Sequence, residues 1–284
     1  MTAPDMQAVL RSMARSSIRL TIGGRADTVV GASRFGGMPD VPADFTWPVF
    51  ETATYDDDAV TARPLAFLAQ FHCEALAPYD TDGLLPKTGV LSFFYELSSQ
   101  RWGYDPADRG CARVFWFPEG AALSPVPFPA ELPDEYRLPA LGITLEPEVT
   151  YPAAEDFYAS RADRDGDWEP YWEARAALDI EDPPDGRSRL LGWPDVIQNS
   201  FFRECELTDR GHYLGGGPVD LSPEDAQAEL DATENWQLLF QLGTVTGEDF
   251  ELMFGDCGRV YFCIRREDLT ARRFDRVWLI LQCG

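Results

Sequence analysis

The feature of this sequence that most constrains its fold is a set of four short segments that occur twice, in the same order. Gly37–Val41 reads GMPDV, and Gly192–Val196 reads GWPDV. Three more pairs follow at comparable offsets: FLAQF (67–71) with LLFQL (238–242), GVLSFFYE from Gly89 with GRVYFCIR from Gly258, and ARVFWF from Ala112 with RVWLIL from Arg276. A shared order of similar segments indicates an internal duplication. We therefore expect residues 33–117 and 190–282 to form matching sheets, related by an approximate two-fold axis.

Apolar periodicity predicts both strands and helices, so the expected fold class is α+β. The predicted strands are 18–22, 64–71, 89–97, 112–117, 141–151, 236–242, 258–265 and 276–282. Helices are expected from Thr2, from Ser222 with Pro223 in the first turn, and twice between Ala153 and Asp182. Residues 33–51, rich in Gly and Pro, are interpreted as a loop.

These elements predict three regions that pack as one globular unit. Residues 1–152 form an N-terminal half, 153–187 a short acidic helical insertion, and 188–284 a C-terminal half.

The charge balance is strongly acidic, with 48 acidic and 24 basic residues and a net charge of −24. Binding to nucleic acid or to an anionic membrane surface needs clustered Lys and Arg, so we expect neither partner. The segment 131–189 alone holds 16 acidic and 6 basic residues, a net charge of −10. Because Trp168 and Trp172 lie among these acids, the insertion is a candidate contact surface for a basic protein partner. The alternative is that both rings pack the insertion onto the domain.

Six cysteines are spread irregularly along the chain. The first 17 residues lack the apolar stretch of a secretory signal, and no run of 18 apolar residues occurs. We therefore expect a cytoplasmic protein with six free thiols. The sequence leaves the oligomeric state open.

The residues that the two halves share are the first candidates for a binding site. They are Gly37, Asp40, Gly192 and Asp195 in the two Gly-x-Pro-Asp-Val loops and Gln70 and Gln241 in the strands that follow. Arg34, which precedes the first loop, is a further candidate. A polar side chain buried between apolar strand neighbours must be hydrogen-bonded. These residues therefore either pin each loop to its sheet or line a cleft between the halves.

No complete catalytic or metal-binding pattern occurs, so no cofactor is expected. His72 and His212 are the two histidines, and Asp163–Asp167 departs from the calcium-loop spacing. Cys257 follows an aspartate, whose negative charge disfavours a nucleophilic thiolate. The first hypothesis is accordingly a non-enzymatic binding protein. The second is a hydrolase or metal-dependent enzyme whose site assembles between the halves from distant residues, such as Arg34, Asp40, Asp195 and Asp256.

Several motifs in combination give the chain a family resemblance. The segments SRFGGMPDVPADFTWP, PLAFLAQF, LLGWPDVIQ and WQLLFQL, then FGDCGRVYF and a closing LQC, resemble the YwqG-like family of uncharacterised bacterial proteins. The resemblance extends from about Ile18 to Cys283. It implies an α+β fold with two sheet-bearing halves. It implies little about function, because no activity is established for the family; some members have been proposed to be immunity proteins against toxins.

Overall fold

The computed structural model describes residues 3–27, 29–159, 168–180 and 187–284. The strands are β1 (Arg15–Arg25), β2 (Arg34–Phe35), β3 (Asp40–Pro42), β4 (Val49–Thr52), β5 (Thr61–Pro64), β6 (Ala66–His72), β7 (Val90–Tyr95), β8 (Ala112–Phe117), β9 (Leu123–Pro125), β10 (Leu141–Thr150), β11 (Ser188–Leu191), β12 (Trp236–Leu242), β13 (Val245–Thr246), β14 (Glu251–Leu252), β15 (Arg259–Arg265) and β16 (Trp278–Gln282). The helices are α1 (Ala3–Ser12), α2 (Cys73–Leu76), α3 (Ala154–Ala159), α4 (Glu169–Ala177), α5 (Phe202–Asp209), α6 (Pro223–Asn235) and α7 (Arg266–Thr270), with short 3-10 turns at Pro106–Asp108, Asp134–Tyr136 and Phe274–Arg276.

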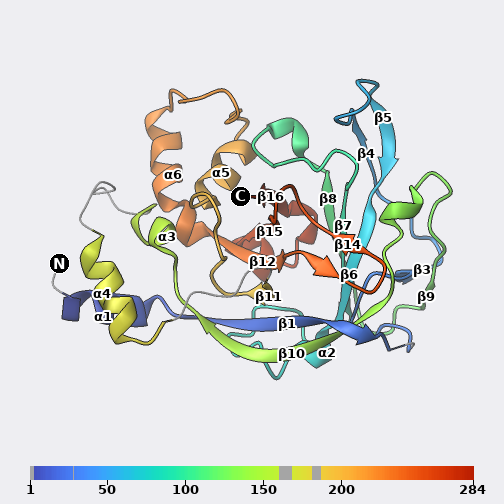
Figure 1. Ribbon diagram of the computed structural model, residues 1–284, viewed down its shortest axis with the longest axis horizontal. Coiled ribbons are helices and arrows are strands. Elements are labelled where there is room, and N and C mark those ends of the chain that lie inside the picture. The colour runs from blue at the N-terminus through green and yellow to red at the C-terminus, as the bar shows by residue number, and fades with distance from the viewer. Residues whose placement is uncertain (1–2, 28, 160–167, 181–186) are drawn as a thin grey trace.

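One large antiparallel sheet organises this mixed α/β fold. Its ten strands have the order β16-β15-β12-β11-β1-β10-β2-β6-β7-β8, and the sheet curves until it is nearly a barrel. The long strands β1 and β10 lie at its centre and run along one side of the molecule (Figure 1). From this pair, four strands extend on each side: β2-β6-β7-β8, called here the N-terminal arm, and β11-β12-β15-β16, the C-terminal arm.

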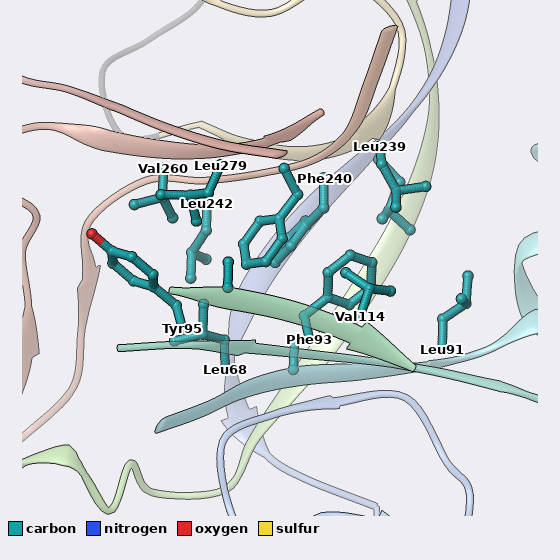
Figure 2. Packing of buried hydrophobic residues seen from close by; sticks show 14 of the residues in the cluster. Leu68, Leu91, Phe93, Tyr95, Val114, Leu239, Phe240, Leu242, Val260 and Leu279 are labelled. Carbon is teal, nitrogen blue, oxygen red and sulfur yellow. The ribbon is translucent and has the colours of Figure 1, made fainter. Parts of the chain in front are cut away.

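The main hydrophobic core lies where the two arms face each other (Figure 2). Phe93 of β7 contacts Phe240 of β12, with ring centroids 4.8 Å apart, and Phe262 of β15 at 5.3 Å. Phe71 reaches the same Phe240 ring at 5.4 Å. Tilted and edge-on aromatic pairs of this kind each contribute about 0.5–1.5 kcal/mol beyond the area that they bury. The arms are therefore held together by a shared aromatic core.

Helices cover the outer side of the C-terminal arm and one end of the β1–β10 pair (Figure 1). Trp236, Tyr261 and Trp278 of this arm form a second core with Phe201 and Phe202 at the start of α5. A third cluster joins α1, α3 and α4. None of the helices in the described part of the chain has the length and apolar character needed to cross a bilayer.

Most of the strands expected from the sequence are present, with boundaries shifted by a few residues. The helix expected at Ser222 is confirmed as well, because the Ser222 hydroxyl accepts a hydrogen bond from the backbone of Asp225 at 3.1 Å. The described residues between Ala153 and Asp182 contain two short helices, α3 and α4, as predicted.

One expectation needs correction, and one helix was missed. Residues 33–51 are not wholly loop, since they contain β2, β3 and the start of β4. Strand β3 (Asp40–Pro42) forms because it pairs with Leu123–Pro125, a segment that lies far away in the sequence. Helix α5 was not predicted, because it buries Glu204, Glu206 and Thr208 together with its apolar side chains and so lacks an amphipathic pattern.

All six cysteines are unpaired. Cys257 is exposed, whereas the other five are buried.

Candidate functional site

The first set of predicted site residues forms a closed hydrogen-bond network in the N-terminal arm. Arg34 donates to the carboxylate of Asp40 at 2.7 Å and to the backbone oxygen of Met38. Gln70, paired with Arg34 across β2 and β6, accepts from the Asp40 backbone at 3.0 Å. Its amide nitrogen donates to Asp40 at 2.8 Å and to the backbone oxygen of Ala32 at 2.9 Å. We call Arg34, Asp40 and Gln70 the N-terminal clamp.

The N-terminal clamp is sealed inside the protein. Asp40 is 1% exposed and Gln70 is fully buried. Burial alone would raise the pKa of Asp40, but hydrogen bonds from Arg34, Gly31 and Gln70 outweigh it and hold this pKa below its ordinary value. Gly37 turns the loop at φ +72°, and a Cβ there would lie 2.8 Å from that of Ala140. Glycine is therefore required for the loop to close over the clamp.

The second set repeats this network in the C-terminal arm. Arg189 donates to the carboxylate of Asp195 at 2.7 Å and to the backbone oxygen of Trp193 at 2.8 Å. Gln241 accepts from the Asp195 backbone at 2.9 Å, and its amide nitrogen donates to Asp195 at 3.0 Å and to Arg187 O at 2.8 Å. We call Arg189, Asp195 and Gln241 the C-terminal clamp. The sequence analysis missed Arg189, although an arginine six residues before the aspartate is common to both loops.

The C-terminal clamp has more charged neighbours than its counterpart. Glu148 of β10 pairs with Arg187 at 2.5 Å and with Arg189 at 3.2 Å. Arg259 and Tyr261 of β15 donate to the backbone oxygen of Asp195 at 3.0 and 2.6 Å. The C-terminal arm and the central strand pair therefore converge on this loop.

Gly192 has the role that Gly37 has in the other half. It adopts φ +78°, and a Cβ at this position would lie 2.5 Å from the hydroxyl of Thr150. That hydroxyl accepts from the backbone of Trp193 at 2.8 Å. Glycine therefore lets the loop reach the end of β10.

Arg189 and Asp195 of the C-terminal clamp line a cleft of about 290 Å³ beside α4. This cleft brings together two predicted site residues, Asp195 and Trp172, with Arg175, Arg187 and Arg259. No residue of the N-terminal clamp is among the described residues that line this cleft. Trp172 is 47% exposed.

Trp168 has a different environment from Trp172. Its ring stacks on Tyr158 with centroids 5.3 Å apart and an interplanar angle of 9°. It packs against the cluster of α1, α3 and α4. Its contacts are those of a packing residue.

Two buried acids that the sequence analysis did not single out have strongly raised pKa values. Burial raises the pKa of Asp156 to about 7, although a hydrogen bond with Ser200 and the positive charge of Arg15 act to lower it. Burial likewise raises the pKa of Glu204 to about 7, against Arg203 and Asn199. Nothing in the sequence marks these two acids among the 48, because burial in the tertiary structure causes both shifts.

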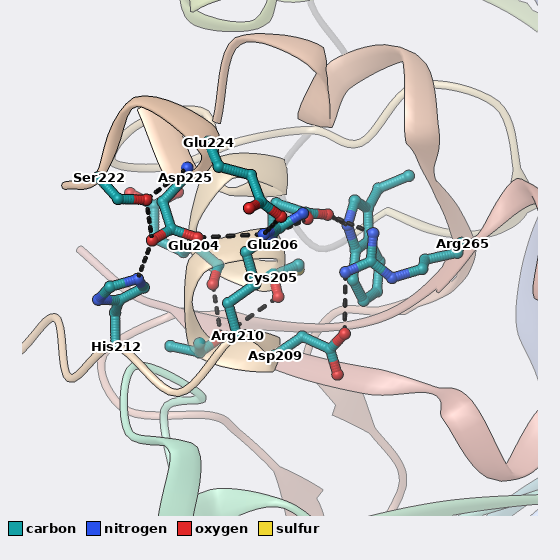
Figure 3. Close-up of polar contacts among 12 residues, drawn as sticks. Glu204, Cys205, Glu206, Asp209, Arg210, His212, Ser222, Glu224, Asp225 and Arg265 are labelled. Atoms are coloured by element: carbon teal, nitrogen blue, oxygen red, sulfur yellow. Dashed lines mark hydrogen bonds and ion pairs between the residues drawn. The ribbon is translucent and has the colours of Figure 1, made fainter. Parts of the chain in front are cut away.

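A third buried acid, Glu206 of α5, is instead the centre of an ion-pair network (Figure 3). It accepts from Trp236 and Arg210, each at 2.7 Å, and from Arg265. These hydrogen bonds outweigh burial and lower its pKa. Each partner comes from a different part of the C-terminal half, so the network fixes α5 against β12 and β15.

The remaining candidates do not come together. His212 contacts Asp225 at 3.2 Å, and His72 lies on β6. Within the described ranges, no three His, Cys, Asp or Glu side chains are grouped closely enough to hold a metal ion. The acidic run Asp163–Asp167 lies outside the described residues. Asp256 is exposed in the turn that precedes β15.

An aromatic groove of about 470 Å³ lies away from both clamps. Four aromatic side chains line it: Tyr55, Trp102, Tyr104 and Tyr213. Tyr55 and Tyr213 are 78% and 56% exposed. No short-range sequence pattern predicts this groove, because its residues come from three separate loops.

Comparison with known proteins places the chain in a family. No similar sequence is found among proteins with curated descriptions. Residues 33–283, which contain both clamps and both arms, match the family described as a domain of unknown function (DUF1963). The chain therefore belongs to the DUF1963 family.

Proposed function

We propose that this chain is a non-enzymatic binding protein for a basic protein partner. The observation that carries the proposal is that the carboxylate and amide groups of both clamps are hydrogen-bonded inside the protein. The charged and amide groups of Asp40, Gln70, Asp195 and Gln241 engage one another or neighbouring backbone. Groups committed in this way hold loops in place and are poorly disposed to act on a substrate. Exposed aromatic rings on an acidic chain are then the groups best suited to contact a ligand.

The matching clamps also support an origin by internal duplication. Counted outward from the central pair, β2-β6-β7-β8 and β11-β12-β15-β16 have the same antiparallel order. Arg34 pairs with Gln70, and Arg189 pairs with Gln241, at the same place in each arm. We infer that the N- and C-terminal halves are copies of one unit joined by the acidic insertion at 153–187.

The basic character of the partner follows from charge. A net charge of −24 attracts a cationic surface and speeds its approach, more so at low ionic strength. The exposed Trp172 offers one aromatic contact within the insertion. A YwqG-like assignment within the family would agree with this proposal, because an immunity protein works by binding another protein.

The test is capture of partners from the bacterial host at low salt, with the purified chain as bait. We expect basic proteins to be retained specifically and released as the salt concentration rises, since the Debye length is about 10 Å at 0.1 M and about 3 Å at 1 M. A partner set with no excess of basic proteins, or retention that salt does not change, would refute the proposal.

A second candidate function is a hydrolase with a site assembled between the acidic insertion and the C-terminal half. The observation in its favour is that Asp156 and Glu204 both have a pKa near 7, the range of a general acid or base. Asp156 is fully buried, so a substrate could reach it only after α3 moves. Mass spectrometry of the native protein distinguishes the two functions, because a tightly bound small molecule would favour the enzyme.

A further inference from the structure

The aromatic groove forms where the two arms meet at the end remote from β1. Tyr55 lies in the hairpin between β4 and β5, Trp102 and Tyr104 lie between β7 and β8, and Tyr213 follows α5. The loop after β7 crosses to the C-terminal half, where the backbone of Trp102 accepts from Leu281 at 3.0 Å. Tyr104 in turn accepts from the backbone of Leu214 at 2.9 Å. Both halves therefore contribute to the groove, and backbone hydrogen bonds fix their relative position.

Gly103 explains why this crossing loop lies so close to the C-terminal arm. A Cβ at Gly103 would lie 1.8 Å from the backbone oxygen of Leu279, so only glycine permits the approach. The indole of Trp278 then donates to the Gly103 oxygen at 2.9 Å. The loop that carries Trp102 and Tyr104 is thus held against the edge strand β16.

The rings of the groove are held in place although they are exposed. The indole nitrogen of Trp102 donates to the hydroxyl of Tyr55 at 3.2 Å. Gly215 lies against Tyr213, where a Cβ would come within 2.4 Å of the phenol oxygen. Exposed rings oriented before binding lose little conformational entropy when a ligand arrives. This arrangement is typical of a recognition surface.

The charge of the groove is negative. Arg101 is already engaged, because it donates to the Thr52 hydroxyl at 2.9 and 2.6 Å and lies 3.9 Å from Asp108. Asp105 also lines the groove, so the two aspartates Asp105 and Asp108 outnumber Arg101 and give the lining a net negative charge. The exposed run 56–58, three aspartates next to Tyr55, adds to the potential at the rim. Asp57 of this run lies 3.6 Å from Arg63.

We propose that the groove binds an arginine side chain of the basic partner, which deepens the proposed function and rests on it. A guanidinium is planar and weakly hydrated, so it stacks on Tyr and Trp faces and also donates to carboxylates. The groove supplies both kinds of group, with Tyr55 and Tyr213 as faces and Asp105 as acceptor. A lysine ammonium is more strongly hydrated and lacks the flat surface for stacking.

The cleft beside α4 is less suited to this ligand. It also has an exposed aromatic side chain, Trp172, but the four arginines that line it outnumber the three acids: Arg175, Arg187, Arg189 and Arg259 against Glu148, Glu155 and Asp195. This excess of positive charge would repel an incoming guanidinium. The difference in lining charge favours the groove as the place where a cationic side chain docks.

The experiment is calorimetric titration at low salt with a short alternating Gly-Arg peptide, and with same-length peptides that carry Lys or Gln in place of Arg. We expect the Gly-Arg peptide to bind most tightly and the Gly-Gln peptide not to bind. Tyr55→Ala and Tyr213→Ala should each weaken Gly-Arg binding about fivefold or more, since a cation–π contact of this strength corresponds to such a ratio. Tyr55→Phe retains the ring and should keep most of the affinity.

Two matched variants control for general effects. Val60→Ala changes an exposed apolar residue of the same hairpin outside the groove, and Glu119→Gln removes one exposed acid elsewhere. Both should bind the Gly-Arg peptide as the unmodified protein does. Asp105→Asn should weaken binding more than Glu119→Gln, although asparagine can still cap the turn at Asp105. Melting temperatures of all variants identify any that fail to fold.

The outcomes separate this inference from the proposed function. If the Gly-Arg peptide binds no better than the Gly-Gln peptide, or if Tyr55→Ala and Tyr213→Ala bind like Val60→Ala, the groove assignment is wrong. A basic partner captured from the host would still support the proposed function in that case. Groove-dependent peptide binding together with no excess of basic proteins in the capture would instead uphold the groove and refute the wider function.

Discussion

The two clamps show how one sequence pattern can be placed in two different environments. In the N-terminal arm, Asp40 is almost fully buried, and its neighbours satisfy it directly. In the C-terminal arm, Asp195 has the same arginine and glutamine partners, but its loop borders a cleft and also contacts β15. The local pattern fixes the clamp itself. The elements packed around it determine whether that clamp is interior or surface.

The largest effect should come from breaking the sealed clamp. Asp40→Asn leaves the Arg34 guanidinium buried without its carboxylate, and the loss of one partner from a buried pair costs about 3–5 kcal/mol. Asp195→Asn should cost less, about 1–3 kcal/mol, because Glu148 remains 3.2 Å from Arg189. Urea unfolding of both variants measures the difference. Equal losses would mean that the two clamps are equally enclosed in solution.

A smaller effect should come from the glycines that close each loop. Gly37→Ala and Gly192→Ala both add a Cβ at positive φ and within 2.8 Å of a neighbouring atom, so each should destabilise the fold by about 2–3 kcal/mol. Gly83→Ala is the control, since its φ is also positive but no atom lies within 4 Å. It should cost about 1 kcal/mol. Similar losses at all three positions would show that the positive φ, and not crowding by neighbouring atoms, is what requires glycine at the start of both pentads.

The smallest effect concerns pH and contrasts two buried acids, Asp40 of the N-terminal clamp and Asp156 of the insertion. The pKa of Asp40 is lowered, so its stabilising contribution is present above its unfolded pKa of about 3.9 and is lost as the pH falls. The pKa of Asp156 is raised to about 7, so its contribution is complete below the unfolded pKa and is lost as the pH rises towards 7.

The substitution Asp156→Asn tests whether the stabilising contribution of Asp156 is lost as the pH rises. The substitution should leave stability near pH 4 almost unchanged and raise it at pH 8 by about 1–2 kcal/mol, a gain limited because Arg15 loses a nearby negative charge. Denaturation curves between pH 4 and pH 8 measure the slope. A variant that is less stable than the unmodified protein at pH 8 would show that Asp156 is ionised and paired in the native state.

Local sequence pattern predicted the parts of the fold that repeat or alternate. It located the core strands, the Ser222 helix and most of the clamp residues, because strand periodicity and capping are local. It could not locate β3, whose partner β9 lies about 80 residues away, or α5, whose buried acids hide its helical pattern. The aromatic groove was missed for the same reason: Tyr55, Trp102 and Tyr213 become neighbours only when the two arms fold together.

The most direct test of this account measures stability and peptide affinity together in two variants, Asp195→Asn and Tyr55→Ala. If the clamps hold the fold and the groove binds the partner, Asp195→Asn should lower the melting temperature and leave Gly-Arg peptide affinity within about twofold. Tyr55→Ala should weaken that affinity about fivefold or more and leave the melting temperature almost unchanged. A folded Asp195→Asn variant that no longer binds the peptide, beside a Tyr55→Ala variant that binds normally, would contradict the account.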